Sequence, residues 1–411
     1  MKSDLDLLMQ ESGIDAIWVT GPAAHNPAMV YFTGLVHVSE ADLIKRRGQP
    51  GKLFHLTMER DEAAKTGLEL CSYANFPMLE LLKASGNDRK KAQILRSQRM
   101  LAEAGITAGR VALYGQADLG KGYSRFKELQ AALPEIEFVG DLDGDVLASA
   151  MFTKDGAEIE RIRKMGEVTT RVVGSVADFL SSRPVRNGAL IGPDGDPLTI
   201  GEVKSRIKLW LAEGGAEDPE GTIFSIGRDA GVPHSAGNPQ DVLRLGQTIV
   251  FDIYPCEAGG GYFYDFTRTW CLGYAPEETQ ALYDQVLSVY RQIMSELKVN
   301  APFKDYQRRT CELFEAQGHP TVLTDPQTEK GYVHSVGHGV GLNIHERPGS
   351  HAMGSAADIL APGSVITIEP GLYYPERNLG IRLEDTVYVR PDGTFEIPAG
   401  YPIDLVLPVG R

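Results

Sequence analysis

The stretch Val250-Phe251-Asp252-Ile253-Tyr254 turns through Gly259-Gly260-Gly261 into Tyr264-Asp265-Phe266-Thr267. Apolar and β-branched residues on both sides of a glycine-rich turn predict a β-hairpin. A second stretch has the same form, because Val365–Glu369 returns through Gly380–Glu384. Each hairpin carries one carboxylate on each strand. A buried, unpaired carboxylate is costly, whereas a divalent cation compensates several carboxylates at once. The two hairpins therefore predict a metal site.

His338 lies between the two hairpins in the chain and adds an imidazole to the four carboxylates. Carboxylate oxygens with one imidazole suit Mn²⁺, Co²⁺, Fe²⁺ or Zn²⁺. Carboxylates can bridge two such ions about 3.5–4 Å apart, and a bridged pair holds a hydroxide at neutral pH. The predicted ligand set indicates a hydrolase; its members are Asp252, Asp265, His338, Glu369 and Glu384.

The bulk composition is that of an ordinary globular protein. The chain has 411 residues, of which 42% are hydrophobic and 23% are charged, enough for two or three cores. A net charge of −14 argues against a nucleic-acid or anionic-membrane partner bound by general electrostatics. The acidic N-terminus does not resemble a signal peptide, and no apolar run reaches the length of a membrane span. Four scattered cysteines suit a reducing compartment, so we expect a cytoplasmic protein.

The first 150 residues alternate strand-like and helix-like segments, which predicts an α/β domain. The expected strands are 16–20, 52–56 and 110–114, and residues 79–104 are expected to be helical with a break at 86–88. This region has no Gly-x-Gly-x-x-Gly motif after a strand and no P-loop, so the sequence gives no support for nucleotide binding.

An acidic turn at 141–145 precedes an amphipathic helix expected at 156–180, so we place the domain boundary there and divide the chain into 1–150 and 151–411. In the second domain two helices precede each hairpin. The further helices are expected at 199–212, 276–297 and 304–317, and 183–197 is expected to be a surface loop. This order predicts an α+β domain of two helix-helix-hairpin halves related by a pseudo-twofold axis.

Five motifs in order carry a resemblance to a known family. They are Val232-Pro233-His234, Asp252 with Tyr264-Asp265-Phe266-Thr267-Arg268-Thr269, Gly337-His338-Gly339-Val340-Gly341-Leu342 with His345-Glu346, Ile368-Glu369-Pro370-Gly371, and Ile381-Arg382-Leu383-Glu384-Asp385. With them the second domain resembles the pita-bread metallopeptidases. The preceding α/β domain resembles, in outline, the creatinase/prolidase-type N-terminal domain of the Xaa-Pro aminopeptidase and prolidase branch.

The resemblance implies a role for each matching residue. Asp252 would bind one metal ion, His338 and Glu369 the other, and Asp265 and Glu384 would bridge the two. Glu369 would also serve as general base and acid, taking a proton from the bridging water and passing it to the leaving amine.

Four further residues match positions around the metals in the same family. His234 and His345 would stabilise the developing oxyanion as catalytic and substrate-binding residues. His334 would line the substrate pocket. Arg382, two residues before Glu384, would orient carboxylates and offset their charge.

The same residues have other interpretations. A single acid near a turn is most often solvated or a helix cap, so the joint order of the motifs decides the assignment. The sequence His345-Glu346 does not continue into His-Glu-x-x-His, which excludes a zincin helix. The Tyr373-Tyr374 pair is interpreted as wall or core.

Three features depart from the family pattern. The first hairpin has a Gly259-Gly260-Gly261 tip and Ile253-Tyr254 where a small residue is usual, and Ser335 replaces a common glycine. The loop 349–361 lacks the arginine that strict dipeptidases use for the substrate carboxylate, leaving His351 and the nearby Arg347. This last departure argues against specificity for dipeptides alone.

We therefore expect a cytoplasmic, homodimeric metallopeptidase that binds two divalent ions and cleaves small peptides with proline in second position. Mn²⁺ is the expected ion, with Co²⁺ and Zn²⁺ as alternatives. A prolidase restricted to dipeptides is one alternative. A catalytically inactive binding protein is another, although such relatives lose metal ligands that this chain retains. A creatinase-like amidinohydrolase without metal is disfavoured for the same reason, and methionine aminopeptidase because it lacks the first domain.

Overall fold

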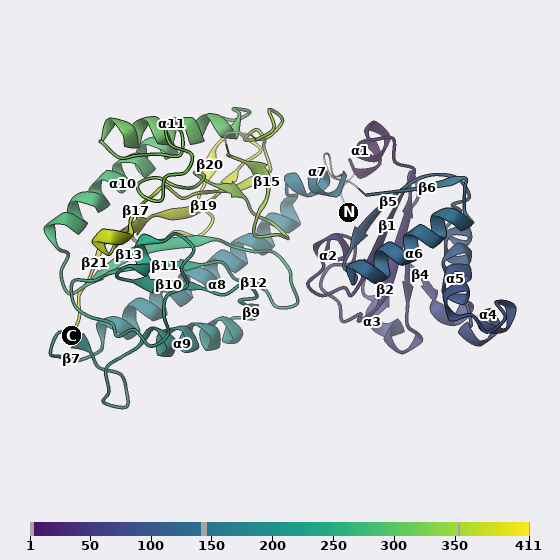
Figure 1. The fold of residues 1–411 in the computed structure, drawn as a ribbon, viewed down its shortest axis with the longest axis horizontal. Coiled ribbons are helices and arrows are strands. Elements are labelled where there is room, and N and C mark those ends of the chain that lie inside the picture. The colour runs from purple at the N-terminus through teal and green to yellow at the C-terminus, as the bar shows by residue number, and fades with distance from the viewer. Residues whose placement is uncertain (1–3, 141–145, 352–353, 411) are drawn as a thin grey trace. The chain divides into compact units, whose positions relative to one another are not determined.

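Two large β-sheets organise the chain, one in each of two compact units (Figure 1). The computed structural model describes residues 4–140, 146–351 and 354–410. The first unit comprises Met1–Met151 with Gly259–Gly261, and the second comprises Phe152–Ala258 with Tyr262–Arg411. The predicted acidic turn at 141–145 and residues 1–3 lie outside the described residues.

The first unit is built on a six-stranded sheet in the order β4-β3-β2-β1-β5-β6. Its strands are β1 (Ala16–Gly21), β2 (Ala41–Arg46), β3 (Gly51–His55), β4 (Glu69–Ser72), β5 (Gly109–Gly115) and β6 (Ile136–Val139). Its helices are α1 (Leu5–Glu11), α2 (Pro27–Thr33), α3 (Arg60–Ala64), α4 (Met78–Ala84), α5 (Arg89–Glu103), α6 (Leu119–Ala132) and α7 (Val146–Phe152). Parallel pairs β1–β5 and β5–β6 adjoin the antiparallel pair β1–β2, which confirms the predicted α/β class.

The predicted break between α4 and α5 has a local cause. Gly86 and Asn87 have positive φ, a conformation that ends a right-handed helix. Asp88 then caps the next helix, because its side chain accepts a hydrogen bond from the backbone N–H of Lys91 at 3.1 Å.

The second unit begins with the long helix α8 (Gly156–Ser181), followed by α9 (Ile200–Glu213). Asp155 and Glu158 form a capping box at the start of α8, and Thr199 and Glu202 form another at the start of α9. Helices α10 (Glu277–Glu296) and α11 (Phe303–Ala316) open the second half. All four helices confirm the predicted ranges to within two residues.

The large sheet of this unit has the order β10-β11-β13-β19-β16-β14-β15. Its strands are β10 (Ile223–Ile226), β11 (Thr248–Ile253), β13 (Phe266–Leu272), β14 (His338–Gly339), β15 (Glu346–Gly349), β16 (Val365–Ile368) and β19 (Glu384–Val389). β20 (Phe395–Glu396) and β21 (Val406–Leu407) extend it off this path, and β12 (Cys256–Glu257) pairs with β9 (Ala216–Glu217).

The two predicted hairpins meet at the centre of the sheet. β11 pairs with β13, β16 pairs with β19, and the antiparallel pair β13–β19 joins the two halves. In Figure 1, β11, β13 and β19 lie side by side. This arrangement of two helix-helix-hairpin halves confirms the predicted α+β pita-bread fold.

The second hairpin differs from the prediction in its pairing. Residues 365–368 pair with 385–388, and the outer part forms a separate two-stranded sheet of β17 (Gly371–Tyr374) and β18 (Leu379–Arg382). The chain bends between these parts, so Val365–Glu369 does not pair with Gly380–Glu384. The predicted loop 183–197 also contains a small hairpin, β7 (Val185–Arg186) with β8 (Ala189–Leu190).

A core of apolar side chains from α10, α11 and strands β16 to β19 supports the sheet of the second unit. The four cysteines, all within the described residues, are buried free thiols. Among the helices that the structure describes, none combines the length and apolar character required to cross a membrane.

Candidate metal centre

The five predicted metal ligands come from five neighbouring strands of one sheet. Asp252 lies near the end of β11, and Asp265 directly precedes β13. Glu384 begins β19, Glu369 directly follows β16, and His338 begins β14. The order β11-β13-β19-β16-β14 therefore brings together side chains that are up to 132 residues apart in sequence (384 − 252).

Four of these side chains lie close together. Asp265, His338 and Glu384 each offer one ligand atom, and these atoms all lie within 4.8 Å of one another. The Nε2 atom of His338 lies 3.5 Å from Oδ2 of Asp265 and 3.4 Å from Oε1 of Glu369. The geometry thus places His338 between carboxylates of both hairpins.

Three buried carboxylate oxygens of this cluster have no hydrogen-bond donor among the described residues: Asp252 Oδ1, Asp265 Oδ1 and Glu384 Oε1. Burial, followed by the neighbouring carboxylate charges, raises the pKa of Asp265 and of Glu384 well above their ordinary values. Burial likewise raises the pKa of Glu369 to about 8, against the opposing effect of the Arg382 charge. Orphaned oxygens in a buried acidic cluster fit a divalent cation.

The His338 ring has the tautomer that a metal ligand needs. Its Nδ1 lies 3.1 Å from the Gly339 carbonyl oxygen, which can only accept, so Nδ1 carries the hydrogen. Burial lowers the pKa of His338 to about 3, so the ring is neutral. The lone pair of Nε2 therefore faces the carboxylates.

Arg382 lies against the same cluster and is buried, with 2% of its surface exposed. Its Nη2 donates to Asp252 Oδ2 at 2.6 Å and its Nη1 donates to the Tyr373 hydroxyl at 2.7 Å. The guanidinium thus orients one carboxylate directly and compensates part of the negative charge. Its partner is Asp252, across the sheet, rather than Glu384 in its own hairpin.

The ring of His334 is held on both nitrogens. Its Nδ1 donates to the Ser335 carbonyl at 2.7 Å. Burial and the Arg382 charge lower its pKa to about 3, so Nε2 is an acceptor, and the Tyr373 hydroxyl donates to it at 2.9 Å. Tyr373 therefore links His334 to Arg382, a role that the interpretation as wall or core missed.

Two threonines outside the predicted set of site residues also contact carboxylates of the cluster. The Thr267 hydroxyl donates to Glu384 Oε2 at 2.7 Å, and the Thr367 hydroxyl lies 3.4 Å from Glu369 Oε1. Each threonine lies two positions from a carboxylate, Thr267 after Asp265 and Thr367 before Glu369. The period of two along a strand was the signal that could have identified them.

His234 and His345 have exposed side chains beside this cluster. The His345 ring lies edge-on to that of His338, with 4.3 Å between ring centroids. Burial lowers the pKa of His345 below its ordinary value, although the Glu220 charge opposes the shift. Glu346, next to His345, forms a buried ion pair with Lys154 that anchors this loop.

Tyr254 and Arg347 lie at two of the places where the chain departs from the family pattern. Burial and the Asp252 and Asp265 charges raise the pKa of Tyr254 above its ordinary value. Arg347 Nε donates to Asp358 Oδ1 at 2.7 Å. That guanidinium is thus already paired within its own loop, of which residues 352–353 lie outside the described residues.

Comparison with known proteins establishes the family. Residues 160–391, more than half of the chain, match the model of metallopeptidase family M24. The chain belongs to this family. M24 proteins are metal-dependent peptidases, in agreement with the acidic cluster on the sheet.

Similar proteins include an Xaa-Pro dipeptidase of Pyrococcus furiosus, 28% identical over 251 residues, which are 61% of this chain and 64% of that protein. That match spans less than two thirds of the relative's length. An Xaa-Pro dipeptidase of Lactobacillus delbrueckii is 24% identical over 94% of this chain and 93% of its own. Both of these relatives carry the name Xaa-Pro dipeptidase.

Solved structures show the same fold. The prolidase from Pyrococcus furiosus superposes with a TM-score of 0.71 at 22% identity, covering 97% of this chain and 99% of that one. An X-Pro aminopeptidase from Thermotoga maritima superposes with a TM-score of 0.74 at 22% identity and the same coverage. At this identity the likeness concerns the fold alone.

Proposed function

We propose that this protein hydrolyses the peptide bond between an N-terminal residue and a following proline. The observation that carries the proposal is the cluster of Asp265, His338, Glu369 and Glu384 on neighbouring strands, with Asp252 on the next strand and three buried carboxylate oxygens that no described donor satisfies. Relatives named Xaa-Pro dipeptidase support the choice of substrate. Proline calls for a dedicated enzyme because its nitrogen carries no hydrogen and its ring fixes the backbone.

We assign the metal ligands as Asp252, Asp265, His338, Glu369 and Glu384. Two divalent ions bound there would acidify a water molecule so that it attacks at neutral pH. Mn²⁺ is the ion we propose, with Co²⁺ or Zn²⁺ as alternatives, because an oxygen-rich set with one imidazole accepts all three. The lone pair of His338 Nε2 and the orphaned oxygens are the contacts that support this assignment.

The remaining residues have positioning and proton-transfer roles. Glu369 holds the proton of the attacking water and returns it to the proline nitrogen as that amine leaves. His234 and His345, exposed beside His338, bind the substrate carbonyl and stabilise the negative charge that develops on it. Arg382 holds Asp252 in place, and His334, fixed by Tyr373, forms the wall of the substrate site.

We propose that longer Xaa-Pro peptides are substrates as well as dipeptides. A strict dipeptidase needs a cation for the C-terminal carboxylate of its substrate. Arg347, the nearest arginine in this loop of the chain, is paired with Asp358. A substrate carboxylate would have to displace that partner, so a requirement for it is not favoured.

The test is hydrolysis of Ala-Pro and Ala-Pro-Gly by protein that has been chelated and then reconstituted with Mn²⁺, Co²⁺ or Zn²⁺. We expect cleavage of both peptides, loss on chelation, and no cleavage of Ala-Ala and Ala-Ala-Gly. Failure to cleave either proline peptide with any of the ions would overturn the proposal. Cleavage of Ala-Pro alone would replace it with a strict prolidase.

A pair of isosteric variants separates a peptidase from a binding protein that reuses the fold. Glu369→Gln should lower kcat by about 1,000-fold or more with the fold retained, because it removes the group that moves the proton. Glu376→Gln makes the same chemical change at an exposed position and should leave kcat unchanged. If both variants keep wild-type turnover, Glu369 has no catalytic role.

We further propose residues 1–150 as the N-terminal domain and 151–411 as the catalytic domain of a cytoplasmic homodimer. Four buried free thiols support a reducing compartment. Leu119 and Tyr123, one helical turn apart on α6, are 87% and 68% exposed, an apolar pair suited to a subunit contact. Light scattering after size-exclusion chromatography tests the dimer; a monomer at micromolar concentration would contradict it.

A further inference from the structure

The segment 331–338, which leads into the ligand His338, is bound along one side to the chain that carries Glu369. The backbone N–H of Gly331 donates to the Tyr373 carbonyl at 2.8 Å, and the N–H of Glu369 donates to the Val336 carbonyl at 2.8 Å. These backbone contacts fix the distance between the 331–338 segment and the chain around Glu369. Among the described residues, the opposite side of the segment is bound near its two ends. Tyr332 forms a bridge with Thr321, and His338 pairs with Gly349 on β15 while the Gly337 backbone N–H donates to the Ser350 hydroxyl at 3.1 Å.

One side chain of α11 occupies that opposite side. The Oε1 atom of Gln307 accepts the backbone N–H of Val336 at 2.6 Å and the hydroxyl of Tyr332 at 2.8 Å. Its Nε2 atom donates to the His334 carbonyl at 3.1 Å. Gln307 thus contacts residues 332, 334 and 336, the alternate positions that a paired strand would contact. It is buried, with 5% of its surface exposed.

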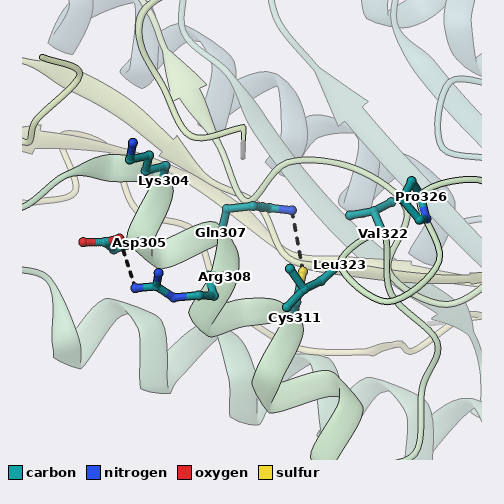
Figure 2. Close-up of a pocket in the computed structure, with 8 residues that line it drawn as sticks. All are labelled: Lys304, Asp305, Gln307, Arg308, Cys311, Val322, Leu323 and Pro326. Atoms are coloured by element: carbon teal, nitrogen blue, oxygen red, sulfur yellow. Dashed lines mark hydrogen bonds and ion pairs between the residues drawn. The ribbon is translucent and has the colours of Figure 1, made fainter. Parts of the chain in front are cut away.

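Packing alone does not hold Gln307 in place, because it borders a cavity of about 480 Å³. Figure 2 shows its side chain pointing toward Cys311, away from the Asp305–Arg308 ion pair on the same helix. The contact on this side is weak, a donation from Nε2 to the Cys311 sulfur at 3.8 Å. The orientation of the amide therefore depends on the three hydrogen bonds to the 331–338 segment.

We propose that Gln307 is a positioning residue that fixes His338 and His334 relative to Glu369 and thereby sets the affinity of the metal site. The inference rests on the proposed metal site. Val336 and His338 are two residues apart, so a shift of the Val336 amide moves the imidazole that faces Asp265 and Glu369. Loss of Gln307 would leave a buried N–H and a buried C=O unpaired, and the segment would move to find partners. Residues that orient metal ligands typically change metal affinity by about 10–100-fold when replaced.

The experiment measures Mn²⁺ binding by isothermal titration calorimetry in the full chain. Gln307→Met keeps the length of the side chain but removes both polar atoms, and we expect at least about tenfold weaker binding. The visible absorption of the Co²⁺-loaded variant should change as well, because the imidazole ligand is displaced. Thr310→Val is the matched control: Thr310 is buried on the same helix, and its hydroxyl donates to the Tyr306 carbonyl at 2.8 Å within that helix. It should bind Mn²⁺ as the wild type does.

Wild-type Mn²⁺ affinity and an unchanged Co²⁺ spectrum in folded Gln307→Met would overturn the inference. Equal weakening in Thr310→Val would also overturn it, because the effect would then be general loss of helix stability. Should Gln307→Met not fold, Gln307→Glu decides, since it keeps the contacts of Oε1 and removes the donor to His334. At pH 8 we expect Gln307→Glu to bind Mn²⁺ at least about threefold more weakly than the wild type. Wild-type affinity in this variant would contradict the positioning role of Gln307.

These outcomes are separate from a failure of the proposed function. Wild-type protein that binds Mn²⁺ but cleaves no Xaa-Pro peptide would refute the activity and leave the role of Gln307 in metal binding intact. Gln307→Met with wild-type affinity would refute the positioning role and leave the activity intact.

Discussion

Buried carboxylates in the two units of this protein have opposite surroundings. In the first unit, Asp42 accepts the Trp18 indole N–H at 2.7 Å and the Tyr73 hydroxyl at 2.8 Å, with Arg125 at 3.4 Å. Although burial opposes it, the Arg125 charge and these donors lower the pKa of Asp42 below its ordinary value. In the second unit, Asp265 and Glu384 face one another and other carboxylates, and their pKa values are raised.

The difference separates a structural carboxylate from a candidate metal ligand. Asp42 meets enough donors to remain ionised in the protein interior without any further group. Asp265 and Glu384 each keep one oxygen without a partner among the described residues. Burial is similar in both cases, so the supply of donors, rather than depth, indicates where a cation belongs.

The largest expected effect comes from Glu384→Gln. Turnover should fall by about 1,000-fold or more, because a bridging carboxylate is lost. The chelated variant should nevertheless be more stable than chelated wild type by about 1–3 kcal/mol, because an uncompensated buried charge is removed. Urea unfolding of both proteins in chelator measures this. A less stable variant would mean that donors already satisfy the Glu384 carboxylate.

The same change at Asp42 should have the opposite effect on stability. Asp42→Asn should lower the free energy of unfolding by about 2–4 kcal/mol, because Trp18, Tyr73 and Arg125 lose a charged acceptor. Turnover of the folded variant should stay at the wild-type value. Asp61→Asn is the control, since the Asp61 side chain is 87% exposed and should unfold as wild type does. Stabilisation by Asp42→Asn would remove the distinction between the two units.

The sequence predicted the carboxylate cluster of the second unit but gave no indication of the role of Asp42 in the first. The glycine-centred hairpins and the order of the motifs predicted the five residues that we propose as ligands, and helical periodicity predicted the four helices of the second unit, because local periodicity and turn chemistry determine those elements. Asp42 carried no such signal. Its donors Trp18, Tyr73 and Arg125 are 24, 31 and 83 residues away in sequence and meet it only after the sheet forms.

The orienting residues around the ligands escaped prediction for the same reason. Tyr373 reaches His334 and Arg382 because the second hairpin bends after Ile368, a change of pairing that the pattern of apolar residues did not show. Gln307 lies on a helix and supports a segment about 30 residues further along the chain. Such contacts depend on tertiary placement, whereas strand and helix periodicity are local.

The pH dependence of stability gives a smaller effect that sharpens the role of Asp42. Because its pKa is lowered on folding, its stabilising contribution is complete above its unfolded pKa of about 4 and is lost as pH falls through the folded pKa. The difference in unfolding free energy between wild type and Asp42→Asn should therefore be constant from pH 7 to about 5 and shrink below about 4. A difference that grows on acidification would show that Asp42 is protonated in the folded protein.

The smallest effects should come from one Tyr→Phe change in each unit. Tyr373→Phe removes the hydroxyl that donates to His334 and accepts from Arg382, so kcat should fall by about tenfold, or about 1.4 kcal/mol, with the free energy of unfolding changed less than kcat. Tyr73→Phe removes a donor to Asp42, so the free energy of unfolding should fall by about 1.5 kcal/mol with turnover unchanged. Steady-state kinetics and urea unfolding give kcat and the free energy of unfolding for each variant. We expect kcat to change mainly in Tyr373→Phe and the free energy of unfolding mainly in Tyr73→Phe. Slower turnover in Tyr73→Phe, or lower stability without slower turnover in Tyr373→Phe, would contradict this comparison. In that case the supply of hydrogen-bond donors to a buried carboxylate would not distinguish a structural residue from a residue of the candidate metal site.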